Sequence, residues 1–163
     1  MEASGTGNMK FMMNGALTLG TLDGANVEIH EEVGDENMFL FGLRAEEVAK
    51  LRPTYISKSF YEKDPEIKAA LDMIKANAFC VLEPGLFDPI IRRLLEYNDY
   101  YMLLADLRAY CEAQDRVDAT YRDAKKWNRM SLVNIARSGR FSSDRAVMEY
   151  AKDIWHVEPV TFA

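Results

Sequence analysis

The sequence predicts a helix-rich α/β fold, and this prediction rests on where its glycines lie and how its apolar residues are spaced. Seven of the nine glycines fall within the first 42 residues, where they separate short apolar runs. The remaining residues have long stretches in which apolar side chains recur at helical spacing. Short strands and tight turns are therefore expected first, followed by a succession of helices.

The first part has the pattern of a helix, a strand, a second helix and a second strand. Residues 8–14 follow a glycine-rich loop and end at Gly15, a common stop signal for a helix. The apolar run 16–22 predicts a buried strand, 25–32 a short helix and 38–41 another strand. Strand, helix and strand in this order favour a parallel sheet.

The later helices are marked by their start signals and their apolar faces. Asp64-Pro65 and Asp88-Pro89 each predict the first turn of a helix. Their expected inner faces are Ile67, Leu71 and Ile74 in the first, and Ile90, Ile91, Leu94 and Leu95 in the second. Two more helices are expected over 107–121 and 127–136, then a last one capped by Ser142 or Ser143, with Val147, Tyr150, Ala151 and Ile154 on one side.

Two short strands are too few for an ordinary doubly wound sheet, which helices cover on both faces. We therefore expect residues 1–163 to form a partial domain, with the loop and strands in 1–45 and the helical part in 46–163. The apolar runs 17–22 and 38–41 need cover, so we also expect a homo-oligomer.

Charge and composition exclude several classes of protein. The net charge is −6, from 26 acidic and 20 basic residues without a basic stripe, which argues against nucleic acid as a partner. No apolar run approaches the roughly 18 residues of a membrane span, so a cytoplasmic protein is expected. Cys80 and Cys111 have no CxxC neighbour and are expected to be reduced, and His30 and His156 have no partner at metal-ligand spacing.

The stretch from Glu2 to Met12 is the one that suggests chemistry. Gly5 and Gly7 flank Thr6 just before a predicted helix, so backbone amides and a hydroxyl converge at a positive helix end. Lys10 follows one helical turn later on the same face, roughly 5.4 Å along the axis. Pyridoxal 5'-phosphate, with an aldehyde and a phosphate arm, could engage both, although a helix cap and a solvated lysine explain the same residues.

Other polar residues have plain structural explanations. Asp23, Gly24 and Asn26 fit a turn between a strand and a helix. The acidic residues of 31–36 fit a solvated loop. Three tyrosines could stack on a sugar, but they fit the rim of an apolar core equally well: Tyr97, Tyr100 and Tyr101.

The whole run from Glu2 to Glu28, EASGTGNMKFMMNGALTLGTLDGANVE, closely resembles the cofactor segment of the α-glucan phosphorylases, the family of glycogen, starch and maltodextrin phosphorylases. Later segments are similar to that family in the same order. They are 39–42 (FLFG), 114–117 (QDRV), Trp127 with Met130, 134–136 (NIA) and 138–145 (SGRFSSDR). The resemblance covers essentially the entire chain.

The resemblance implies that Lys10 is the Schiff-base lysine of pyridoxal 5'-phosphate, and that Gly5, Thr6 and Gly7 hold its phosphate. It places Glu2, Ser4 and Gly5 on the transferred glucose. It also implies phosphorolysis of terminal α-1,4-linked glucose to glucose 1-phosphate, and a fold that closes the C-terminal Rossmann-like domain of a glycosyltransferase B type enzyme.

The family's N-terminal domain and the first half of its C-terminal domain have no counterpart in the chain. The expected partners are therefore the remainder of a phosphorylase chain, an α-1,4-glucan and inorganic phosphate, and the chain alone is expected to be inactive. The alternative is a truncated, non-catalytic module that binds the cofactor or another protein.

Overall fold

The computed structural model of the chain describes residues 5–158 and 160. Their contacts divide the chain into two compact units with interleaved segments, which we name by one residue of each. The Arg108 unit contains residues 21–23 and 40–116, and the Lys10 unit contains residues 5–20, 24–39 and 117 onward. Each unit is described by itself.

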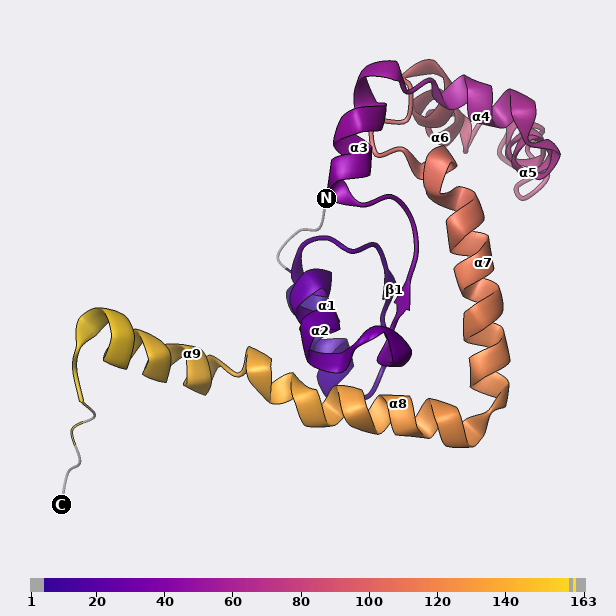
Figure 1. The fold of residues 1–163 in the computed structure, drawn as a ribbon. Helices are drawn as coiled ribbons and strands as arrows, with labels where there is room; N and C mark the ends of the chain where they lie inside the picture. The colour runs from indigo at the N-terminus through magenta and orange to yellow at the C-terminus, as the bar shows by residue number, and fades with distance from the viewer. Residues whose placement is uncertain (1–4, 159, 161–163) are drawn as a thin grey trace. The chain divides into compact units, whose positions relative to one another are not determined.

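The secondary structure is predominantly helical, with one two-stranded parallel sheet formed by β1 and β2 (Figure 1). The elements in chain order are α1 (Thr6–Met13), β1 (Leu19–Gly20), α2 (Ala25–Val33), η1 (Asp35–Asn37), β2 (Phe39–Leu40), α3 (Ala45–Leu51), η2 (Arg52–Thr54), α4 (Ser57–Lys63), α5 (Pro65–Lys75), α6 (Asp88–Ile91), η3 (Arg92–Glu96), α7 (Leu103–Arg122), α8 (Ala124–Arg137), η4 (Ser138–Phe141), α9 (Ser143–Glu149) and η5 (Tyr150–Trp155). Of these, η3 and η5 are π-helical.

The Lys10 unit is built on α8, which packs against both α1 and α2 (Figure 1). Asn134 is fully buried in α8, and its amide donates to the backbone oxygens of Asn37 at 2.8 Å and Met130 at 3.0 Å. Ser131 donates to the backbone oxygen of Gly15 at 2.8 Å, where α1 ends at a positive φ of 80°. These side chains pair buried backbone oxygens that would otherwise cost free energy, so α8 fixes where α1 ends.

The Arg108 unit has its own apolar core. Ile67 and Leu71 of α5 are buried against Ile91 and Leu104, and six partly buried side chains surround them: Phe60, Tyr61, Ile74, Leu94, Leu95 and Leu107. Because α5 presents every third or fourth residue to this cluster, its apolar stripe is what attaches it to the unit.

A buried polar cluster fixes the turn before α7. The Tyr55 hydroxyl donates to Oδ2 of Asp99 at 2.8 Å, and the backbone N–H of Leu104 donates to the same oxygen at 2.8 Å. Burial and the adjacent Asp99 carboxylate raise the pKa of Tyr55, so its hydroxyl keeps its proton and remains the donor. Asn98 bonds both Ser57 and Tyr55 through their backbones, which holds the positive φ of Asn98 and Asp99 in place.

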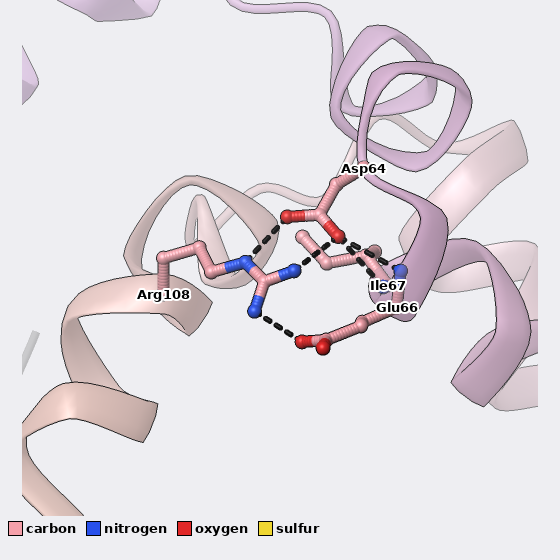
Figure 2. A network of polar contacts seen from close by, with 4 residues as sticks. All are labelled: Asp64, Glu66, Ile67 and Arg108. Carbon is pink, nitrogen blue, oxygen red and sulfur yellow. Dashed lines mark hydrogen bonds and ion pairs between the residues drawn. The ribbon is translucent and has the colours of Figure 1, made fainter.

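Arg108 of α7 clamps the start of α5 (Figure 2). Its Nε and one terminal nitrogen each lie 2.5 Å from an oxygen of Asp64, and the other terminal nitrogen bonds Glu66. Asp64 also accepts the backbone N–H groups of Glu66 and Ile67, as the N-cap of α5. One carboxylate therefore caps a helix and ties it to α7.

The helix-rich α/β prediction is confirmed, and most differences concern the ends of elements. The strands are two residues long rather than seven and four, and β1 is only half-buried. The first helix begins at Thr6, two residues before the predicted start, because Gly5 enters it directly. In the described part of the chain both cysteines are free, and no helix is long and apolar enough to cross a membrane.

Two predicted apolar faces differ from the structure. Ile90, expected on an inner face, is 48% exposed, whereas its neighbour Ile91 is buried and Leu94 and Leu95 are partly buried against the core. In the last helix, Val147 and Ile154 are 54% and 60% exposed. Ser142 occupies the N-cap position of α9 but makes no side-chain capping bond.

Replacing Arg108 by alanine is expected to lower the free energy of unfolding and to make that free energy less dependent on pH in the acid range. Hydrogen bonds from Arg108 lower the pKa of Asp64 from 3.8 to about 2. A carboxylate with a depressed pKa stabilises the folded state above its unfolded pKa, and this contribution is lost as the pH falls toward its folded pKa. Between about pH 4 and pH 2, urea midpoints from circular dichroism should therefore fall more steeply for wild type than for Arg108→Ala.

The matched control is Arg122→Ala, which removes an exposed pair with Asp118 within α7 itself. It should leave the acid dependence of the wild type intact. Parallel acid profiles for wild type and Arg108→Ala would contradict the assignment of the clamp.

Candidate functional site

The entrance to α1 requires glycine at position 5. Gly5 is the buried N-cap of α1 with a φ of 67°, a left-handed conformation that other residues adopt at a cost. A Cβ there would collide with the Cβ of Ala25 at the start of α2. The loop backbone thus lies directly against α2, and Gly5 accepts the N–H of Met9 at 3.2 Å as the helix begins.

The two faces of α1 have different roles. Met12 is completely buried, and the Asn8 amide donates to Oδ1 of Asn26 in α2 at 2.8 Å. Helical spacing places four other residues on a single stripe away from that face: Thr6, Met9, Lys10 and Met13. Because α1 packs against α2 through its other face, Thr6, predicted to bind phosphate, and Lys10, predicted to bind the cofactor, lie on the same side of α1.

An open cavity of about 360 Å³ borders this stripe. Met9, Lys10 and Met13 line one side of it. The other side is the turn formed by η4 and the start of α9, with Ser138, Gly139, Phe141, Ser142 and Ser143. Ligand sites commonly have volumes of about 300–1,000 Å³, apolar walls and a few polar groups, and this cavity fits that description.

The structure brings together the predicted residues that it describes. Gly5, Thr6, Gly7 and Lys10 all belong to the cap and first turns of α1. Glu2 and Ser4, predicted to contact glucose, lie outside the described residues. The turn at 138–143 was not among the site residues predicted from the sequence, although its SGRFSSDR segment is part of the resemblance to the phosphorylases.

The other candidates from the sequence lie elsewhere. Asp23, Tyr100 and Tyr101 line a separate cavity of about 790 Å³ in the Arg108 unit, where the guanidinium of Arg52 lies 5.0 Å from the ring centre of Tyr100. Asp106 borders the same cavity, and burial raises its pKa. Within the described residues, no group of three His, Cys, Asp or Glu side chains could hold a metal ion.

Comparison with known proteins identifies the family. Residues 1–157 match the family described as carbohydrate phosphorylase. The chain belongs to this family. It is 53% identical over 159 residues to the liver form of glycogen phosphorylase from Bos taurus and 54% identical over 159 residues to the human liver form, in each case covering 97% of the chain and 19% of the relative. It is 48% identical over 157 residues to glycogen phosphorylase from Chlamydia pneumoniae, covering 96% of the chain and 19% of that protein.

This phosphorylase chain spans about a fifth of the length of the relatives it matches. The relatives are named as glycogen phosphorylases, which are enzymes. The resemblance noted from the sequence is therefore confirmed, including its extent over nearly the whole chain.

Exchanging Gly5, the N-cap of α1, and Gly7, in its first turn, for alanine should separate their roles. Gly5→Ala is expected to lower the free energy of unfolding by at least about 1–2 kcal/mol, because alanine resists a positive φ and its Cβ has no room against Ala25. Gly7→Ala is the matched control, since a Cβ at Gly7 meets nothing within 4 Å and alanine favours helix by up to about 1 kcal/mol.

Urea unfolding followed by the fluorescence of Trp127 and Trp155, which both lie in the Lys10 unit, measures both variants. Equal stabilities for the two variants would contradict the close approach of Gly5 to α2.

Proposed function

We propose that this chain supplies the cofactor lysine of a pyridoxal-phosphate-dependent α-glucan phosphorylase. The observation that carries the proposal is the stripe on α1, where Lys10 lies one turn after Thr6 and beside an open cavity. Membership of the carbohydrate phosphorylase family supports the same assignment. Pyridoxal 5'-phosphate fits these residues because the stripe offers an amine at one position and a hydroxyl with helix N-terminal amides at another.

In this proposal the amine of Lys10 would hold the cofactor covalently by condensing with its aldehyde, with loss of one water. Backbone amides of Gly5, Thr6 and Gly7, with the Thr6 hydroxyl, would hold the phosphate at the positive end of α1. When bound, the cofactor's phosphate would supply an acid or base near neutrality, because its second pKa lies near 6. The left-handed Gly5 keeps these amides fixed before the phosphate arrives, which lowers the cost of binding.

The reaction of the whole enzyme would be phosphorolysis of a terminal α-1,4-linked glucose to glucose 1-phosphate, with Glu2, Ser4 and Gly5 on the glucose. We assign the chain to the closing part of a C-terminal Rossmann-like domain of the glycosyltransferase B type. Its partners would be the remainder of the phosphorylase chain, an α-1,4-glucan and inorganic phosphate. A cytoplasmic location and a homo-oligomer are part of the same proposal.

A second candidate function is a non-catalytic module that binds the cofactor or another protein. The Lys10 stripe and the cavity beside it both lie within the described residues and would serve such a module as well. The two functions agree on Lys10 and differ on whether any glucan is cleaved.

Pyridoxal 5'-phosphate should attach selectively to Lys10 in the purified chain. Incubation with the cofactor, reduction with borohydride and peptide mass mapping are expected to place most of the adduct on Lys10. Lys10→Arg should abolish this adduct, whereas Lys50→Arg, on the exposed helix α3, should not change it. Labelling spread evenly over the surface lysines would refute the assignment.

The chain alone should form no measurable glucose 1-phosphate from maltodextrin and phosphate. Groups that clamp phosphate and orient the sugar would have to come from the remainder of the enzyme, and transfer of a glucosyl group to phosphate depends on such positioning. The assay couples glucose 1-phosphate to a reporter enzyme, with a full-length phosphorylase as the positive control. Turnover comparable with that control would show that the site is complete in these residues.

A further inference from the structure

We infer that the turn over residues 138–143 is the second wall of the Lys10 site, and that Ser142 is a positioning residue for the bound cofactor. This inference rests on the proposed function and extends it to a segment that the function does not otherwise use. It assigns to Ser142 a hydroxyl contact with the polar edge of the cofactor ring, and to Phe141 an apolar contact with the ring itself.

The position of the turn is the first argument. The face of α1 that carries Asn8 and Met12 is occupied by packing within the unit. The opposite stripe, with Met9, Lys10 and Met13, borders the cavity whose other wall is the turn. Any flat group joined to Lys10 on that side therefore lies between α1 and the turn.

The turn is held in one conformation by contacts of its own. The Ser142 N–H donates to the Gly139 oxygen at 3.1 Å, and Nε of Arg145 donates to the Arg140 oxygen at 2.6 Å. Arg145 is fixed in turn by an ion pair with Glu149. Arg140 also lies 3.7 Å from a carboxylate oxygen of Glu32 in α2. A wall held in this way is organised before a ligand binds, so less ordering is needed on binding.

The chemistry of the lining is the second argument. Met9, Met13 and Phe141 offer apolar contacts for an aromatic ring. The Ser138 hydroxyl is already used, since it donates to the Ile135 oxygen at 2.7 Å. Ser142 is half-buried at the N-cap position of α9, yet its hydroxyl makes no capping bond there. A hydroxyl in this position is suited to bond the ring nitrogen or the hydroxyl substituent of a pyridine ring.

The test compares four forms of the chain: wild type, Ser142→Ala, Ser142→Thr and Ser142→Val. Threonine and valine have nearly the same shape and differ in the hydroxyl, so they separate a lost hydrogen bond from altered packing. Ser59→Ala, which removes a hydroxyl bonded to Ile56 in the Arg108 unit, is the matched control. Pyridoxal 5'-phosphate is the probe, and three quantities are measured: its dissociation constant, the position of its absorption band and the urea midpoint without cofactor.

Ser142→Ala and Ser142→Val are expected to weaken binding about 5- to 10-fold, the effect of one hydrogen bond, and to shift the absorption band. Ser142→Thr should restore both properties, and Ser59→Ala should change neither. The urea midpoints of the threonine and valine variants should agree, which shows that the difference in binding is not one of folding.

The outcomes distinguish this inference from the function on which it rests. If the wild-type chain forms the Lys10 adduct and all Ser142 variants bind the cofactor like wild type, the inference is wrong and the proposed function stands. If valine and threonine weaken binding equally, the hydroxyl has no role and the inference is also wrong. If the wild-type chain forms no adduct at Lys10, both are wrong.

Discussion

The close approach of Gly5 to Ala25 is the constraint on which the candidate site depends. With no side chain at Gly5, the loop reaches α2 and enters α1 through a left-handed residue. That entry sets the rotation of α1 about its axis, and Met12 and the Asn8–Asn26 bond then hold it. Thr6 and Lys10 share the outer stripe because the inner one is fully used. The orientation of Lys10 thus follows from backbone packing at Gly5, five residues earlier in the chain.

The helices of the Arg108 unit are positioned by a different set of interactions. Its helices meet around Ile67, Leu71, Ile91 and Leu104, and polar groups specify how they meet. Asp64 is both the N-cap of α5 and the partner of Arg108 (Figure 2). Asp99 similarly serves both Tyr55 and the start of α7. In each case a single carboxylate satisfies helix N–H groups and a distant side chain, so helix ends and helix packing are specified together.

The sequence predicted the features that depend on local rules. Pro65 after Asp64 marked the start of α5, and the spacing of Ile67 and Leu71 marked its buried face, because capping and periodicity act within a few residues. The Lys10 stripe was predictable for the same reason. The turn at 138–143 was not, since it lies more than a hundred residues from Lys10 and only the folded chain brings the two together. The strands were overestimated because apolar runs show the potential to pair, whereas the paired length depends on neighbouring strands.

Some apolar helix faces that the sequence predicted to be buried are exposed to solvent in the structure. Val147, Tyr150 and Ile154 keep helical spacing in the last helix, yet each is at least half exposed. Leu82 is 98% exposed. Isolated apolar residues on a protein surface are ordinary. Apolar residues that recur at helical spacing are typical of a helix that packs against another part of a protein. Under the proposed function, these stripes would be surfaces suited to the rest of a phosphorylase. Periodicity in a sequence therefore describes the packing for which a helix is suited, whereas the exposure of each side chain shows how much of that packing the described residues provide themselves.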